Sequence, residues 1–152
     1  MKRDIIFDMD GTLCDTSKRQ HYLQGPRRNR NWVAFKEEAI QDAPHNDVIW
    51  LARLLKEAGC RLVICTARTE EEREVTVQWL KEVGKCYDLF DKIYMRANKD
   101  YRDDADIKLE LLEQIRADGY DPYMVFDDRD RVVNAWRNKA KLRCMQVNHG
   151  DF

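Results

Sequence analysis

Short apolar runs alternate along the chain with longer stretches in which apolar residues recur at helical spacing. The apolar runs predict five β-strands, at "DIIFD" (4–8), "RLVIC" (61–65), "KIYM" (92–95), "PYMVFD" (122–127) and "RCMQV" (143–147). Several of these runs are apolar throughout, which is typical of strands covered on both faces of a parallel sheet. One stretch of helical spacing lies between each pair of consecutive strands, at residues 46–59, 69–84, 106–119 and 129–139. This alternation predicts an α/β fold with a Rossmann-like, doubly wound parallel sheet.

Two of the predicted helices carry capping signals at their ends. Gly59 stands where a glycine that ends a helix is expected, and Thr69 with Glu72 three residues later has the sequence of a capping box. Three tryptophans lie on the apolar faces of the predicted helices and are therefore expected in the core: Trp50, Trp79 and Trp136.

The segment 14–35 is longer than an ordinary connection between a strand and a helix, and it predicts a small cap insertion after the first strand. No acidic residue occurs from Thr16 to Phe35, while five basic residues do: Lys18, Arg19, Arg27, Arg28 and Arg30. Residues 18–31 are either a solvated, mobile loop or a surface for a nucleic-acid backbone, with Tyr22 or Trp32 available to stack a base. So small an insertion leaves a site open, which suits a macromolecular end better than an engulfed metabolite.

Composition limits the class of protein. A chain of 152 residues fits one domain, 1–152, and its net charge of −1 gives no global attraction to polyanions. No apolar run approaches the ~20 residues that span a bilayer, and the N-terminus has no signal-peptide pattern. The five cysteines form no C-x-x-C pair: Cys14, Cys60, Cys65, Cys86 and Cys144. We therefore expect reduced thiols in a cytoplasmic protein that has no membrane partner.

Candidate chemistry lies at the strand ends, because ligands of an open parallel sheet bind beyond the carboxyl ends of its strands. Polar residues of distinct kinds occur there: Asp8 and Asp10 at the first strand, Thr66 and Arg68 at the second, Asp127 and Asp128 at the fourth, and Lys108 on the helix after the third. Four neighbouring carboxylates cannot all ionise without a counter-charge. Mg²⁺, which prefers oxygen ligands and shares them with substrate phosphate, would supply that charge.

Such a group of residues is suited to phosphoryl transfer. One carboxylate can attack phosphorus to form an aspartyl-phosphate, and a second carboxylate two residues on can protonate the leaving oxygen and then deprotonate water. Thr66 can donate to a phosphoryl oxygen, while Lys108 and Arg68 balance the charge of the transition state. Gly11 permits a tight turn or a close backbone approach directly after the strand.

Four motifs in order resemble those of the haloacid dehalogenase (HAD) superfamily: "DMDGTL" (8–13), "VICTAR" (63–68), Lys108 and "VFDDRD" (125–130). The resemblance implies that Asp8 is the nucleophile and Asp10 the general acid/base, with Thr66 and Lys108 as further catalytic residues. It implies a substrate position for Gly11 and Thr12. It also implies a Mg²⁺ ion held by Asp8, the Asp10 carbonyl and Asp127, with Asp128 near it.

A closer resemblance is to the 3′-phosphatase domains of bacteriophage polynucleotide kinases. It rests on the C-terminal stretch "VFDDRDRVVNAWRN…LRCMQVNHGDF", on Arg19 shortly after the first motif, and on Arg68 two residues after the hydroxyl of the second. It implies that both arginines serve the substrate together with an aspartate of the third motif. Among Asp103, Asp104 and Asp106, we choose Asp104 for that role.

These observations predict a Mg²⁺-dependent phosphomonoesterase that removes 3′-phosphate from DNA or RNA ends. The string G-x-x-x-x-G-K-[ST] does not occur, so a 5′-kinase activity is not supported. Two alternatives stay open: the same chemistry on a free nucleotide monophosphate, and a nucleic-acid end-binding module that has lost turnover. No protein partner is implied.

Overall fold

The computed structural model describes residues 2–152. Its centre is a five-stranded parallel sheet in the order β5-β4-β1-β6-β7. The strands are β1 (Asp4–Phe7), β4 (Arg61–Thr69), β5 (Phe90–Arg96), β6 (Pro122–Asp127) and β7 (Arg143–Gln146). The predicted parallel α/β sheet is therefore confirmed, with β1 at its centre.

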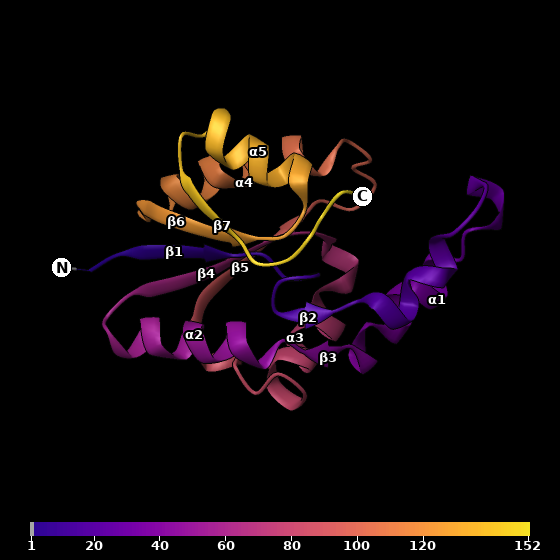
Figure 1. The fold of residues 1–152 in the computed structure, drawn as a ribbon, viewed down its shortest axis with the longest axis horizontal. Coiled ribbons are helices and arrows are strands. Elements are labelled where there is room, and N and C mark those ends of the chain that lie inside the picture. Colours follow the sequence, from indigo (N-terminus) through magenta and orange to yellow (C-terminus); the bar gives the residue numbers. More distant parts are fainter. Residues whose placement is uncertain (1) are drawn as a thin grey trace.

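Helices cover both faces of the sheet (Figure 1). One layer contains α2 (Asn46–Glu57) and α3 (Arg73–Glu82), and the other contains α4 (Asp104–Ala117) and α5 (Asp130–Asn138). Side chains alternate along β1 between the two layers, because successive residues of a strand point to opposite faces. Ile5 and Phe7 pack with α2 and α3, whereas Ile6 packs with α4 and α5.

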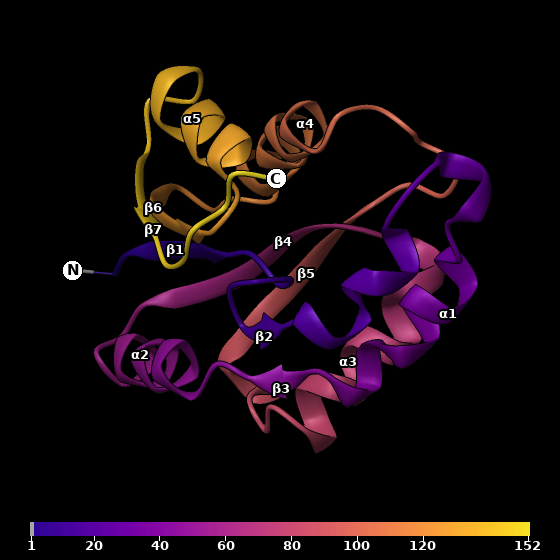
Figure 2. The ribbon, with the colours of Figure 1, turned by 45° about the vertical axis from the view of Figure 1, so that its right-hand side comes forward.

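The predicted insertion after the first strand is present as a cap on the sheet, but it is longer than the predicted 14–35 and continues to Pro44. It begins with β2 (Cys14–Asp15) and ends with β3 (Ala43–Pro44), which pair antiparallel. Between these strands lie α1 (Trp32–Glu37) and the 3₁₀ turns Ser17–Leu23, Arg27–Asn29 and Glu38–Gln41. Figure 2 shows β2 and β3 beside α3, and Trp79 Nε1 of α3 donates a hydrogen bond of 2.8 Å to the backbone oxygen of Asp42 in the cap.

The capping signals read from the sequence are confirmed. Gly59 has φ +97° just beyond α2, a conformation that favours glycine. Thr69 donates from its backbone N to Glu72 Oε2 at 2.7 Å, which forms the capping box before α3. The second strand is longer than predicted, because it continues through Thr66 and Arg68 to Thr69.

The prediction for the tryptophans is wrong at one position. Trp79 and Trp136 are fully buried, but Trp50 is 63% exposed. The buried face of α2 is formed by Val48, Ile49 and Ala52. Trp50 follows Ile49 by one residue, or about 100° around the helix, and so turns away from the sheet.

Among the described residues, none of the helices has both the length and the apolarity that crossing a bilayer requires.

We predict that two Trp→Phe substitutions change the free energy of unfolding by very different amounts. Trp79→Phe should lower the free energy of unfolding by about 2 kcal/mol, because it opens a cavity and leaves the buried oxygen of Asp42 without its donor. Trp50→Phe should change it by no more than about 0.5 kcal/mol. Urea unfolding of both variants measures the difference, and equal losses would contradict the assignment of Trp50 to the surface.

Candidate active site

The carboxyl ends of β1 and β6 bring three buried carboxylates together. Asp8 follows β1 directly, Asp127 ends β6, and Asp128 comes next. Each offers an oxygen within 4.8 Å of the others. Lys108 of α4 lies between two of them, because its Nζ donates to Asp8 Oδ1 at 2.8 Å and to Asp127 Oδ2 at 2.7 Å. We call these four residues the Asp8 cluster.

Close packing fixes the carboxylates of the Asp8 cluster. Asp127 accepts hydrogen bonds from Trp136 Nε1 at 3.0 Å and from the Asp128 backbone N at 2.8 Å. Thr12 Oγ1 donates to Asp8 Oδ2 at 3.3 Å. Gly11 has φ +80°, and a Cβ there would lie 2.0 Å from Asp128 Oδ2. The glycine of the first motif is therefore required by both conformation and space.

The Asp8 cluster has less positive than negative charge. Burial and the charge of Asp127 raise the pKa of Asp8 well above its usual value, and burial with the same neighbour raises the pKa of Asp128 to about 6. Burial alone would lower the pKa of Lys108, but the charges of Asp127 and Asp8 outweigh it and raise this pKa instead. A buried set of hard oxygen ligands that lacks positive charge fits a divalent cation such as Mg²⁺.

Asp10, two residues after Asp8, lies in an opposite electrostatic environment. Arg68 donates to its Oδ1 from Nε at 3.0 Å and also from a terminal nitrogen, and Arg19 donates to the same oxygen at 3.0 Å. Burial acts to raise the pKa of Asp10, but the charges of Arg68 and Arg19 outweigh it and hold the pKa at about 2. The two aspartates of the first motif are therefore shifted in opposite directions.

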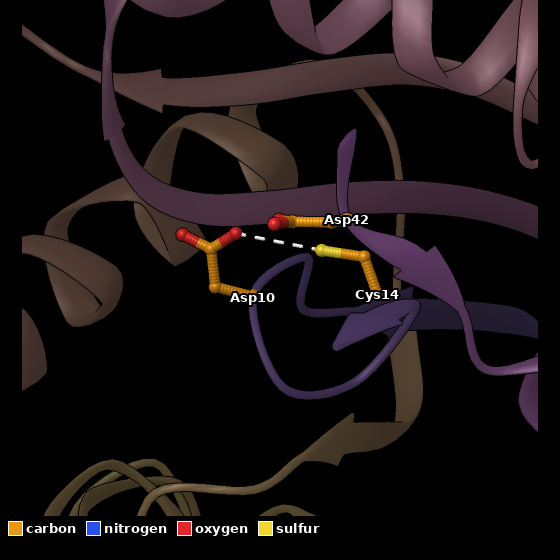
Figure 3. A group of neighbouring side chains, drawn as sticks. All are labelled: Asp10, Cys14 and Asp42. Carbon is orange, nitrogen blue, oxygen red and sulfur yellow. Dashed lines mark hydrogen bonds between the residues drawn. The ribbon is translucent and has the colours of Figure 1, made fainter. Parts of the chain in front are cut away.

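A further carboxylate completes this second group, and the sequence analysis missed it. Asp42, which is 2% exposed, accepts from Arg19 Nε and from a terminal nitrogen of Arg19, each at 2.9 Å. Figure 3 shows Asp42 beside Asp10 and Cys14, whose Sγ lies 3.5 Å from Asp10 Oδ1. The sequence around Asp42 carries no motif, and its ion-pair partner lies 23 residues away along the chain.

Arg19 and Arg68, which were predicted to bind the substrate, are buried against protein groups. Arg19 also donates to the backbone oxygen of Phe35 at 3.1 Å, and Arg68 donates to Thr76 Oγ1 at 2.9 Å. Their guanidinium groups contact the predicted catalytic residues through Asp10. The structure therefore gives them a clear role in holding that carboxylate.

The remaining predicted residues lie at the same edge of the sheet or next to it. Thr66 is buried in β4, and its Oγ1 accepts from the Arg68 backbone N at 3.1 Å, which leaves the hydroxyl hydrogen available. Asp104 begins α4 four residues before Lys108, and it pairs with Arg96 and, at 2.6 Å, with Arg129. Asp103 instead caps α4 by accepting from the Ala105 backbone N at 3.0 Å.

Comparison with known proteins identifies the family. A family model described as the polynucleotide kinase PNKP phosphatase domain matches residues 2–152. A protein of Autographa californica nuclear polyhedrosis virus, named provisionally as a bifunctional polynucleotide kinase/RNA ligase, is 28% identical over 140 residues, which are 90% of this chain and 18% of that protein.

Solved structures agree with this family. In a structure titled as the Pnkp1/Rnl/Hen1 RNA repair complex, one chain superposes with a TM-score of 0.81 and 32% identity, covering 99% of this chain and 43% of that one. A haloacid dehalogenase-like hydrolase from Streptococcus pneumoniae has a TM-score of 0.69 at 16% identity, covering 95% and 83%, and it supports the fold alone. This chain thus spans less than half the length of the Pnkp1-type and viral relatives. It belongs to the family of PNKP phosphatase domains, within the HAD fold.

Proposed function

We propose that the chain is a Mg²⁺-dependent phosphomonoesterase that removes the 3′-phosphate from DNA or RNA ends through an aspartyl-phosphate. The observation that carries the proposal is the placement of Asp8, which is buried, paired with Lys108, and two residues from an acid/base carboxylate held by two arginines. Membership in a polynucleotide phosphatase family and the likeness to a chain of an RNA repair complex support the substrate class.

In the first half of the proposed reaction, an Asp8 oxygen attacks phosphorus, and the bond between phosphorus and the sugar oxygen breaks. Asp10 gives its proton to the departing oxygen, which becomes the 3′-hydroxyl. Arg19 and Arg68 keep Asp10 ionised in the free chain. The negative charge of an arriving phosphate offsets these arginines and so raises the affinity of Asp10 for that proton.

In the second half, the ionised Asp10 takes a proton from water, the water oxygen attacks phosphorus, and the bond to Asp8 breaks. Inorganic phosphate leaves and Asp8 is restored. Lys108 stays within hydrogen-bond distance of Asp8 in the free chain, so it can balance negative charge beside the reacting carboxylate. Thr66, with its free hydroxyl hydrogen, is the proposed donor to a phosphoryl oxygen.

Asp8, Asp127 and Asp128 would hold Mg²⁺, since they form the buried oxygen cluster that lacks positive charge. When bound, the ion neutralises these carboxylates and polarises phosphoryl oxygens.

The nucleophile and the substrate class are tested together by phosphate release. We expect release from a 3′-phosphorylated oligonucleotide to exceed release from the matching 5′-phosphorylated strand and from free nucleotide monophosphates. Asp8→Asn should lower the rate about a thousandfold or more, because an amide is a poor nucleophile. Preference for free nucleotides would replace the end-repair proposal by the small-substrate alternative. An inert chain that Asp8→Asn does not change would favour the binding module.

Mg²⁺ binding has a readout that does not depend on turnover. At a concentration about 100 times its dissociation constant, Mg²⁺ should stabilise the folded chain by about 2.7 kcal/mol. Asp128→Asn removes one oxygen ligand and should reduce this gain by more than half, whereas Asp88→Asn on the surface should leave it intact. Thermal melts with Mg²⁺ or chelator measure the effect, and a full gain in Asp128→Asn would remove this residue from the proposed site.

Asp42 is proposed to position Asp10 through Arg19, and its substitution should affect both stability and turnover. Asp42→Asn leaves buried Arg19 with one carboxylate fewer, so we expect a loss of about 3 kcal/mol in the free energy of unfolding. With Arg19 free to shift, kcat should fall at least about tenfold while KM changes less. Asp91→Asn, which breaks an exposed pair with Lys56, is the matched control and should lose less than about 1 kcal/mol. Wild-type kcat in Asp42→Asn would show that Asp10 keeps its geometry without it.

A further inference from the structure

We propose that the outer face of the cap binds the backbone of a single-stranded polynucleotide upstream of its 3′ end, an inference that rests on the proposed function. The surface is residues 17–32, here called the basic arm. Its exposed cations are Lys18, Arg27, Arg28 and Arg30. The arm follows β1 and the Asp8 motif in the sequence, and Figure 1 shows the insertion extending from the end of the sheet toward which β1 runs.

The cations of the basic arm are concentrated and unpaired. No acidic residue occurs between Thr16 and Phe35, although the whole chain has a net charge of −1. Within residues 2–152, the four exposed cations of the arm form no ion pair. Some exposed arginines elsewhere are paired, as Arg73 is with Glu70 and Arg131 with Asp103, whereas others such as Arg116 and Arg143 are also unpaired. Positive charge that lacks an internal partner in an acidic chain is suited to an external polyanion.

The backbone of the basic arm is held by hydrogen bonds on its inner side. Asn31 N donates to the Tyr22 backbone oxygen at 2.8 Å, and Tyr22 Oη donates to Glu38 Oε1 at 2.7 Å. Arg19, which belongs to the same arm, points inward and is 1% exposed. Because the inner side is tied to Asp10 through Arg19, the outer cations keep a defined position relative to the active site.

An aromatic residue lies at the end of the basic arm. Trp32 is 48% exposed, and its ring meets Phe35 edge to face with centroids 5.7 Å apart. The guanidinium carbon of Arg19 lies 4.2 Å from the centre of the Phe35 ring. Trp32 thus offers a ring surface to solvent while Phe35 separates it from the buried arginine. Unpaired cations beside an exposed aromatic ring are the combination that single-strand binding surfaces use.

The closing experiment measures binding and turnover separately. A fluorescent single strand of about 12 nucleotides with a 3′-hydroxyl end is titrated with the full chain, as RNA and as DNA, from about 50 to about 200 mM salt. The arm variant is Arg27→Gln/Arg28→Gln/Arg30→Gln. The control, Arg116→Gln/Lys139→Gln/Arg143→Gln, removes the same charge from exposed positions at the opposite edge of the sheet.

We expect the arm variant to bind at least about tenfold more weakly at low salt, and the slope of log K against log salt to fall by about 2. The ratio of KM for a 3′-phosphorylated strand to KM for a nucleoside 3′-monophosphate should rise by a similar factor. Trp32→Ala should weaken strand binding about fivefold without changing the slope. The control variant should match the wild type in each measurement.

Two results distinguish failure of the proposed strand binding from failure of the proposed reaction. Equal binding and equal salt slopes in the arm and control variants would overturn the proposal that the basic arm binds the strand, even if 3′-phosphate is released. A chain that binds the strand through the arm but releases no phosphate would support the binding role of the arm and overturn the proposed reaction instead. Neither outcome depends on the arm residues for folding, because all six substituted side chains are exposed.

Discussion

Compensation of buried negative charge is the constraint on which this site depends. Moving an ion out of water costs several kcal/mol unless a partner of opposite charge is placed well. The carboxyl edge of the sheet gathers five carboxylates: Asp8, Asp10, Asp42, Asp127 and Asp128. Three cations from three parts of the fold contact four of these carboxylates, all except Asp128: Lys108 from α4, Arg68 from β4 and Arg19 from the cap. The ion pairs therefore fasten the cap and one helical layer to the central strand.

The cations are distributed unevenly over the carboxylates, and this distribution gives the two aspartates of one short motif different pKa values. Asp10 meets two arginines, and its pKa is held at about 2, while Asp8 shares a single lysine with Asp127 and its pKa is raised. Opposite shifts in neighbouring carboxylates are how one site obtains two chemical roles. Here the separation follows from geometry, since Asp8 continues the line of β1 and Asp10 lies beyond it, near the cap.

The sequence predicts the parts of this fold that rest on local periodicity. The apolar runs identify all five strands of the sheet, and "DMDGTL" locates its active edge. β2 and β3 contain two residues each, too few for any periodic signal. Trp50 is predicted in the core because it is apolar and lies within α2, but it lies outside the buried face that Val48, Ile49 and Ala52 form. Local periodicity cannot identify Asp42, because its role depends on an ion pair with Arg19 that forms only in the folded chain.

The same ion pairs bear on how a cap this small contributes to catalysis. A large lid encloses its substrate, whereas this cap places one buried arginine on Asp10 and leaves its other side facing solvent. Residues that bind a chain outside the site lower the barrier only if they hold it at a fixed distance from the reacting groups. Arg19 meets this requirement, because the segment that carries the exposed cations also carries the residue bound to Asp10 and Asp42. The proposed strand-binding surface and the arginine that holds Asp10 thus belong to one segment, in which Arg19 is buried while Lys18, Arg27, Arg28 and Arg30 are exposed.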